Sequence, residues 1–592
     1  MNRWLSLSFA WSSLLWVSLV RAAGPVPDIS PTLAPDDGYS ALERSVIGQK
    51  LAERGLELDP LPEGKRIEQV EIVTLDVFDE RDPMPDFVNL LHTTTRRRVI
   101  RRELLFSEGD RYRAVLAHET ARNLRELVQL SIVLVVPTRG SSPDRVRVLV
   151  ITKDVWSLRL NWLLQSTNGH INSLVLNPSE ENLFGTHAIV GGYFVLDPAT
   201  YSLGVSLSHR RLFGSHQLAV IAANVIRNRD TGAAEGSFGE FRYGQPLYSL
   251  DTKWSWGTSM LWRHDIARRF NGITVAKRDG IPVVYDRDRL YGGYQVVRSF
   301  GRRFKYDLSF GIEAVRSVYE KPDLAAQSAR LAKDFSAKEL PISDQRVSPF
   351  VQLHAHRTDF AQMIEVETLG LQEDFRRGHD LLLRLYPASS AVGSTRDLLG
   401  SLAVLSYTFP LADGLVRPLL GHRVEYAAGG RDDALFEADL RFVSPRFGLG
   451  RLLVDGKFQN RYRNYLNRRT SLGGDNRLRG YPAGAFPGAD LVAANVELRT
   501  TSIDIFSAQV GAAAFYDVGD AADAVRQFNL KQSAGVGLRI LFPEFDRIVF
   551  RADWGFPLSP GYQPLPGAFF VSFAQAFALP GVAVPSVLTE TL

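Results

Sequence analysis

Few side chains of this sequence are spaced as catalytic residues are. The chain has no Cys among its 592 residues, which excludes thiol catalysis, disulfides and zinc sites built from cysteine. It contains no phosphate-binding P-loop, no HExxH, no GxSxG and no EF-hand loop. His264 precedes Asp265, but no Ser completes a triad. We therefore predict that the protein is not an enzyme and uses no cofactor.

His354 and His356 are the one pair of histidines with a spacing that suits a metal. On a strand, residues two apart lie on the same face. A metal site needs more ligands than the sequence identifies beside this pair. We therefore expect them to be surface or lumen histidines, with no metal.

The stretch Gly473–Pro487 (GGDNRLRGYPAGAFP) sets Arg479 among glycines and apolar residues. Its Gly and Pro residues exclude the interior of a helix or of a central strand. The stretches that follow alternate apolar and polar residues with a period of two, as strands do. A guanidinium enclosed by such strands requires a paired carboxylate.

Composition and the first residues indicate an exported β-protein. The net charge of +4 gives no overall signature of nucleic-acid binding. Residues 1–23 have Arg3, a mostly apolar run and small residues at their end, as a secretory signal peptide does; an N-terminal membrane anchor is the alternative. No later apolar run has about 20 residues, yet 45% of the chain is hydrophobic, with 34 Phe and 19 Tyr. Such an exported chain is a candidate β-barrel.

Residues 156–577 contain sixteen to twenty candidate strands of about ten residues. One face of each strand is apolar and the other charged, which in a membrane barrel places the charges in a wet lumen; a soluble sandwich is the alternative. The inward charges include Glu497, Asp517, Arg539 and Asp553. We predict surface loops at Asn271–Arg287 and Tyr319–Ile342, the second with a short helix at Ala325–Ala337. We expect early strands at Trp156–Leu164, His187–Val195 and Tyr201–His209. The final strand is expected at Gly567–Phe577, followed by a tail at 578–592.

Residues 66–155 predict a small α+β domain after a linker at 24–65 that holds a helix near Ser40–Gly55. The expected order is strand, helix, helix, strand, strand. The corresponding ranges are Arg66–Val77, Thr93–Leu105, Tyr112–Val128, Ser131–Val136 and Arg145–Thr152.

This order, with Glu108-Gly109-Asp110 between the two helices, resembles a POTRA domain. Leu478-Arg479-Gly480-Tyr481 and Phe515-Tyr516-Asp517-Val518-Gly519 are similar to motifs of the BamA/TamA and two-partner-secretion superfamily. The resemblance implies a sixteen-stranded outer-membrane barrel whose final strand carries an assembly signal, here Phe573 and Phe577. It also implies that the N-terminal domain lies in the periplasm of a bacterium, where an open sheet edge can add a strand from a client or partner. A spacer that only positions the barrel is the alternative role of this domain.

From these motifs we predict that the loop folds into the lumen as a latch. Arg479 is expected to bond Asp517 on the inner wall, beside Gly519. Gly480 lets the backbone approach that wall closely, and Tyr481 adds apolar area with a polar tip. Further inward-facing residues are Glu497, Arg539 and Asp553. A plug stabiliser in an ordinary pore is the alternative role.

Three functions stay open on the sequence alone. The protein inserts or assembles other outer-membrane proteins, secretes a partner polypeptide, or is a passive pore or structural barrel. The expected partners are the outer-membrane bilayer, client or secreted polypeptides and periplasmic accessory proteins, without nucleic acid.

Overall fold

The computed structural model describes residues 39–77, 93–320, 327–475, 477–506, 508–545, 548–562 and 565–573. The predicted signal peptide, Phe577 and the tail 578–592 lie outside these ranges. The chain divides into two compact units, Met1–Leu56 and Glu57–Leu592. Within the described ranges, no helix has the length and apolarity that a membrane crossing requires.

The first unit contains the helix α1, Ala41–Arg54. Ser40 and Glu43 form a capping box, in which each side chain accepts a hydrogen bond from the backbone N–H of the other residue. Gly55 ends the helix in the left-handed conformation. The helix predicted near Ser40–Gly55 is therefore present, inside the segment predicted as a linker.

The second unit begins with a small α+β domain. Its elements are β1 (Arg66–Leu75), α2 (Arg97–Glu103), α3 (Ala114–Arg125), β2 (Leu130–Arg139) and β3 (Arg145–Asp154). The sheet has the order β1-β3-β2, in which β1 is parallel to β3 and β2 is antiparallel to it. This is the predicted order of strands and helices, with boundaries shifted by a few residues.

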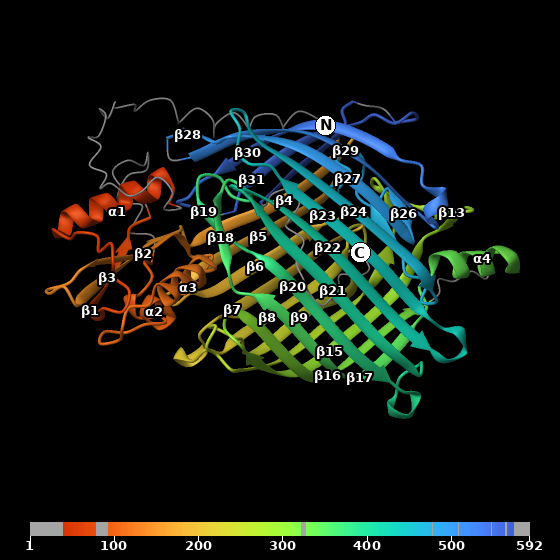
Figure 1. Cartoon of the computed structure of the whole chain (residues 1–592). Helices are drawn as coiled ribbons and strands as arrows, with labels where there is room; N and C mark the ends of the chain where they lie inside the picture. Colours follow the sequence, from red (N-terminus) through yellow and green to blue (C-terminus); the bar gives the residue numbers. More distant parts are fainter. Residues whose placement is uncertain are drawn as a thin grey trace. The chain divides into compact units, whose positions relative to one another are not determined.

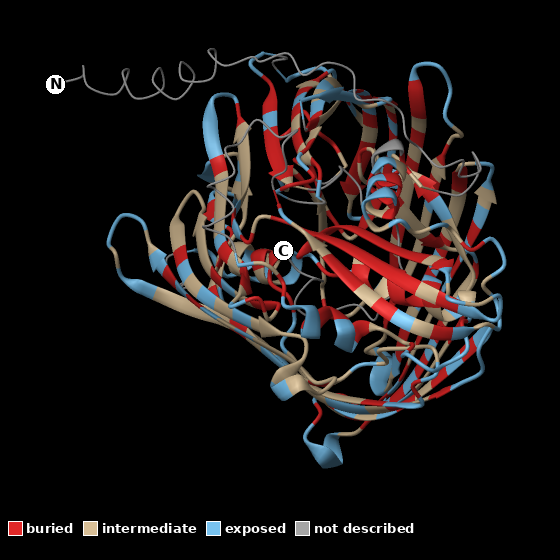
Figure 2. Cartoon of the chain, turned by 90° about the vertical axis from the view of Figure 1, so that its left-hand side faces the viewer, coloured by how far each residue is buried: buried red, intermediate tan, exposed pale blue. Residues whose placement is uncertain are grey.

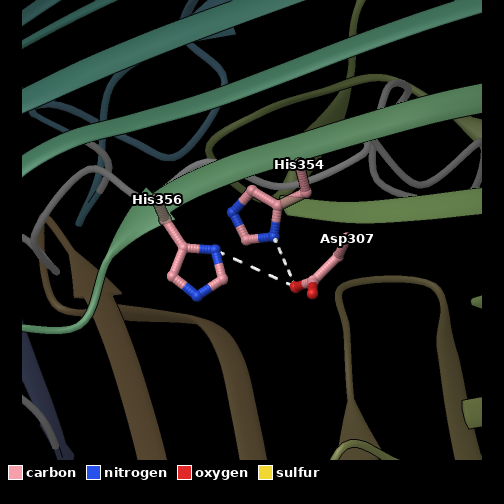
Figure 3. A group of neighbouring side chains, drawn as sticks. All are labelled: Asp307, His354 and His356. Atoms are coloured by element: carbon pink, nitrogen blue, oxygen red, sulfur yellow. Dashed lines mark ion pairs between the residues drawn. The ribbon is translucent and has the colours of Figure 1, made fainter. Parts of the chain in front are cut away.

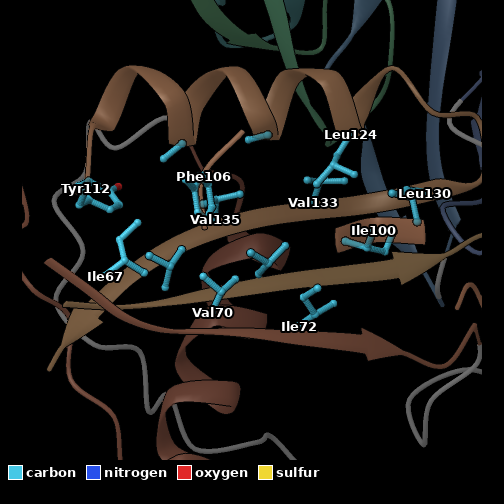
Figure 4. Close-up of a cluster of buried hydrophobic side chains, with 14 of the residues drawn as sticks. Ile67, Val70, Ile72, Ile100, Phe106, Tyr112, Leu124, Leu130, Val133 and Val135 are labelled. Carbon is cyan, nitrogen blue, oxygen red and sulfur yellow. The ribbon is translucent and has the colours of Figure 1, made fainter. Parts of the chain in front are cut away.

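The core of the small domain lies between the sheet and its helices (Figure 4). Leu124 of α3 packs there, whereas Val115 of the same helix is 60% exposed. Ala117 and Ala121 occupy the buried stripe instead. The helix was predicted correctly, and its buried face contains two small alanines.

One edge of this sheet is partly occupied. The N–H of Asp59 donates to the carbonyl of Pro137 at 3.1 Å, and the N–H of Arg139 donates to Glu57 at 2.9 Å. Leu58 and Thr138 thereby form an antiparallel bridge at the end of β2. A strand added at this edge would have to use the earlier residues of β2 or displace the segment that precedes β1.

The rest of the second unit is a closed antiparallel barrel (Figure 1). Its first ten strands are β4 (Leu158–Thr167), β5 (His170–Leu183), β6 (Ala188–Leu196), β7 (Thr200–His209), β8 (Leu218–Asn228), β9 (Ala234–Gln245), β10 (Trp254–Arg268), β15 (Val284–Phe300), β16 (Phe304–Glu320) and β17 (Asp344–Arg357). The remaining strands are β20 (Gly378–Ala388), β21 (Leu398–Leu411), β22 (Gly414–Ala427), β23 (Asp433–Val443), β24 (Gly450–Asn464), β27 (Asp490–Thr500), β28 (Ile503–Ile505), β29 (Ala508–Ala522), β30 (Lys531–Leu541), β31 (Phe550–Pro557) and β32 (Ala568–Phe573).

The described residues make twenty crossings of the barrel wall, because β27 and β28 both pair with β29 and belong to one crossing. The sixteen strands implied by the resemblance are therefore too few, and the upper count from the alternation is right. Among the described residues, the barrel runs from Leu158 to Phe573, within the predicted 156–577.

Burial alternates along the barrel strands as the sequence predicted (Figure 2). In β29, Ala513, Phe515 and Asp517 are buried, whereas Ala514 and Tyr516 between them are exposed. Strands of nine or more residues are long enough to cross the hydrocarbon layer when tilted. A charged interior and an apolar outer face identify the architecture as an outer-membrane-type barrel.

The longest connections lie at one end of the barrel. The chain enters at the start of β4 and leaves after β32, so both lie at the same end, here called the N-terminal end. At the opposite end, the connections contain β11 (Phe270–Asn271), β12 (Thr274–Val275), β13 (Lys277–Arg278), β14 (Ile281–Pro282), α4 (Ala329–Glu339), β25 (Thr470–Leu472) and β26 (Phe486–Gly488). At the N-terminal end, the hairpin of β18 (Phe360–Ile364) and β19 (Gln372–Arg376) precedes β20.

The predicted loop Asn271–Arg287 extends too far. Val284 begins β15, and Arg287 is a buried wall residue whose guanidinium donates to Asp265 on β10 at 2.8 Å. Asp279 and Gly280, both with positive φ, form the turn between β13 and β14. The connection therefore ends before Val284, earlier than the predicted Arg287. The helix expected at Ala325–Ala337 is present as α4.

Candidate functional site in the barrel lumen

The loop Gly473–Pro487 lies between β24 and β27, at the opposite end of the barrel from β4. Five crossings follow it, as predicted. Its base is closed by β25 and β26, where Leu472 pairs with Phe486. Gly473 and Gly474 have φ of 121° and 71°, a region that L side chains rarely adopt, so these glycines permit the turn into the loop.

Arg479 lies at the centre of this loop and is fully buried. Its Nε and Nη2 each donate to one oxygen of Asp517 at 2.9 Å, and its backbone N–H donates to the same carboxylate at 3.0 Å. The predicted contact with Asp517 is therefore present. This fork geometry is the one in which arginine binds carboxylates most strongly.

Two further carboxylates bind the same guanidinium. Nη1 of Arg479 donates to Glu497 on β27 at 2.6 Å and to Asp553 on β31 at 3.1 Å. The guanidinium carbon also lies 3.5 Å from the centre of the Phe515 ring. One loop residue thus joins three strands of the inner wall, whereas the sequence predicted only one bond.

The surrounding arginines balance the charge. Arg539 binds both Glu497 and Asp553, Arg499 binds Glu497 at 2.7 Å, and Arg551 binds Asp553 at 2.9 Å. Arg551 also pairs with Asp475 of the loop. We call the eight residues the latch cluster: Asp475, Arg479, Glu497, Arg499, Asp517, Arg539, Arg551 and Asp553. Its four arginines and four carboxylates cancel in charge, which is the condition under which buried ions are tolerated.

The loop backbone lies directly against the wall beside the cluster. A Cβ on Gly480 would stand 2.7 Å from Cβ of Ser533 and 2.9 Å from the backbone of Phe556. A Cβ on Gly555 of β31 would stand 1.9 Å from the carbonyl oxygen of Arg479. Both positions require glycine, so the predicted close approach at Gly480 is present and has a matching glycine on the wall.

An apolar patch anchors the rest of the loop. Leu478 and Tyr481 are fully buried in a cluster with Leu472 and Phe486. The hydroxyl of Tyr481 donates to the carbonyl of Gln532 at 2.8 Å, which satisfies its polar tip. Gly519 faces this patch, since a Cβ there would meet Leu472 at 2.8 Å.

The structure brings together most of the residues singled out in the sequence. Leu478, Arg479, Gly480, Tyr481, Asp517 and Gly519 meet at the loop, and Glu497, Arg539 and Asp553 belong to the same cluster. Phe573 lies elsewhere, at the end of β32, where its ring packs 5.5 Å from that of Phe550.

Asp475, Arg499 and Arg551 were not among the predicted site residues. The period-two pattern places Arg499 and Arg551 on the inner face with Glu497 and Asp553, two residues away in each case, but it does not show that they bind these carboxylates. Nothing in the sequence indicates that Asp475 turns towards β31, because its position depends on the path of the loop.

A second charged array lies on other wall strands. Arg346 donates to Glu313 at 2.7 Å and lies 3.3 Å from Glu425, while Arg384 binds Glu313 at 3.2 Å. The hydroxyl of Tyr386 donates to Glu425 at 3.1 Å. These five residues, here called the cavity wall, line a cavity of about 500 Å³ together with residues of β9, β10 and β15.

No family model matches this sequence, and no curated protein matches it. Solved structures do. CdiB from Acinetobacter baumannii is 11% identical at a TM-score of 0.43, with 90% of this chain and 81% of that chain covered. CdiB from Escherichia coli is 12% identical at a TM-score of 0.43, with 88% and 80% covered. BamA from Haemophilus ducreyi lacking POTRA domains 1–3 is 13% identical at a TM-score of 0.36, with 90% and 94% covered.

Proposed function

We propose that this protein assists the insertion and assembly of other proteins in a bacterial outer membrane. In this proposal the barrel spans the outer membrane, and the small domain lies in the periplasm, where it contacts clients or accessory proteins. The loop Gly473–Pro487 holds the last five crossings in one arrangement while the client strand is received at the barrel wall.

The observation that carries this proposal is the short seam between β32 and β4. Among the described residues, which end at Phe573, four residue pairs join the two strands, from Ala568 with Thr167 to Val571 with Leu164, whereas fifteen pairs join β10 and β15. Among the described residues, Leu158–Leu163 of β4 have a strand partner on the β5 side alone. Backbone N–H and C=O groups at such an edge can pair with an added strand.

The seam can be tested by locking it, because the chain has no Cys of its own. Ser166 and Phe569 lie opposite each other across the seam. The double variant Ser166→Cys/Phe569→Cys would form a disulfide there under oxidation. Val190 and Leu207, an outward-facing pair between β6 and β7, provide the matched control in the double variant Val190→Cys/Leu207→Cys.

We expect the locked seam to stop assembly of client barrels in cells and the reductant to restore it, while the control pair changes nothing. The readout is the amount of folded outer-membrane barrel proteins in the membrane fraction. Full assembly with a verified disulfide at the seam would reject the proposal.

Secretion of a partner polypeptide is the second candidate, and the cavity of about 500 Å³ favours it. Its lining of arginines, carboxylates and tyrosine suits a polar chain in transit. Depletion of the protein in cells distinguishes the two candidate functions. Broad loss of barrel proteins supports assembly, and loss of one secreted protein supports secretion. No change in either, with ion conductance in reconstituted bilayers, would indicate a passive pore.

A further inference from the structure

We propose that Asp307, His354 and His356 form a binding site for a divalent cation of the zinc class on the inner wall of the barrel. Asp307 lies on β16 and directly opposite His354 on β17, and His356 is two residues further along the same face. Their three ligand atoms all lie within 4.8 Å of one another. Figure 3 shows both imidazole rings turned towards the carboxylate.

The distances suit a tetrahedral ion after a small contraction. Nδ1 of His354 and Nδ1 of His356 each lie 3.9 Å from Oδ2 of Asp307. Zinc binds nitrogen and oxygen ligands at about 2.0–2.2 Å, which places tetrahedral ligands about 3.4 Å apart. A movement of about half an ångström brings the carboxylate oxygen to that separation from each imidazole nitrogen, and the two nitrogens lie within 4.8 Å of each other.

Two buried polar atoms of the cluster make no hydrogen bond among the described residues. Asp307 and His356 are each 7% exposed, and neither Oδ1 of Asp307 nor Nδ1 of His356 has a hydrogen-bond partner there. An unpaired buried polar atom costs free energy, and both atoms are of types that bind metal. A cation held by both oxygens of the Asp307 carboxylate and by Nδ1 of His356 would satisfy both atoms.

Asp380 sets the tautomer of His354. Nε2 of His354 lies 2.7 Å from the carboxylate of Asp380 on β20. When Nε2–H donates to that carboxylate, Nδ1 keeps its lone pair and points to Asp307. Such an outer carboxylate behind a histidine ligand is the usual support of a metal site.

The neighbouring cations do not fill the site. Lys305 lies opposite His356, but its ammonium donates to the carbonyl of Leu250 at 2.7 Å. Arg376 pairs with Asp380, with 3.4 Å between Nη1 and Oδ2. His354 is only partly buried, so the fourth position of the ion is open to water in the lumen.

The donor set selects the class of ion. Two imidazoles and one carboxylate suit zinc, cobalt and nickel, whereas magnesium and calcium prefer oxygen ligands alone. The site would tie β16 to β17 near the N-terminal end of the barrel, about ten residues from the far ends of these strands.

The test is metal binding by the full chain in detergent, purified through a tag without histidine. We expect one Zn²⁺ per chain by calorimetry and, with Co²⁺, the intense visible absorption of a tetrahedral complex. His356→Ala and Asp307→Asn should each weaken Zn²⁺ binding at least tenfold, and Asp380→Asn about tenfold. His264→Ala, which removes a histidine exposed on the outside of β10, should leave binding unchanged.

Folding of each variant is followed by the heat-dependent gel mobility of the barrel, so that loss of binding is not confused with loss of structure. The Co²⁺ spectrum of the wild-type protein tests the site without any variant, so it holds even if a variant fails to fold. Absence of Zn²⁺ binding by wild type, binding that survives both ligand substitutions, or tighter binding of Ca²⁺ than of Zn²⁺ would overturn the site.

Discussion

The latch cluster and the cavity wall are both arrays of buried arginines and carboxylates in the same lumen, yet they are built from different parts of the chain. In the latch cluster the central guanidinium belongs to a loop, and Arg479 binds three carboxylates on three strands. In the cavity wall every charge belongs to the wall itself, and a cavity of about 500 Å³ remains. The comparison teaches that a single loop residue can join charges on three wall strands, whereas charges of the wall itself line an open cavity.

The largest effect should follow removal of the central guanidinium. Arg479→Ala leaves Asp517, Glu497 and Asp553 buried without the cation that joins them, which costs about 3–5 kcal/mol. The midpoint of unfolding, measured by heat-dependent gel mobility or urea in detergent, should fall accordingly. A midpoint equal to that of wild type would show that the cluster does not stabilise the barrel.

Reversing one pair sharpens the same point. If Arg479 and Asp517 formed an isolated pair, the double variant Arg479→Asp/Asp517→Arg would restore stability. Because Glu497 and Asp553 also bind Arg479, we expect the double variant to stay close to Arg479→Ala. Full recovery would contradict the joint role of the three carboxylates.

A smaller effect is expected in the cavity wall. Arg346→Ala removes a partner of Glu313 and Glu425, but Arg384 still binds Glu313 and Arg396 still binds Glu425 at 2.6 Å. The expected cost is about 2 kcal/mol, that of a hydrogen bond to a charged group. A loss as large as that of Arg479→Ala would remove the contrast between the two arrays.

Close packing of the loop backbone predicts an effect of similar or smaller size. Gly480→Ala forces a Cβ against Ser533 and Phe556, at a cost of about 1–3 kcal/mol. Gly456→Ala on β24 is the matched control, because a Cβ there meets nothing within 4 Å. Limited trypsin digestion should cut the loop faster in the first variant alone; equal rates would show that the loop does not lie against the wall.

The smallest effect should come from an exposed pair outside the lumen. Arg316 and Asp288 form an ion pair whose side chains are 45% and 39% exposed. Arg316→Ala should change stability by no more than about 1 kcal/mol, measured by the same unfolding midpoint. A larger change would mean that burial is not what distinguishes the lumen arrays.

The barrel and the loop's main contact were predictable because they depend on local pattern. The period-two phase of β29 places Asp517 inward without any knowledge of the fold. The number of strands was not fixed in the same way, since β5 contains Asn177, Glu180 and Asn182 and alternates poorly.

Contacts between distant strands could not be predicted. Arg479 and Asp553 are 74 residues apart, and their meeting depends on the path of the loop and on closure of the barrel. Asp307 likewise became a neighbour of His354 only through the register of β16 and β17. The expectation of no metal at His354 and His356 was based on the lack of a third ligand in the sequence. The register of the two strands supplies that ligand, Asp307.

The most direct test of the account is whether Arg479 holds the loop in the lumen. Leu478 is fully buried, whereas Leu530, in another connection at the same end, is 51% exposed. In this chain without cysteine, Leu478→Cys should resist a water-soluble maleimide and become reactive when Arg479→Ala is added, while Leu530→Cys reacts in both backgrounds. Rapid labelling of Leu478→Cys with Arg479 intact, or no increase when it is removed, would contradict the account.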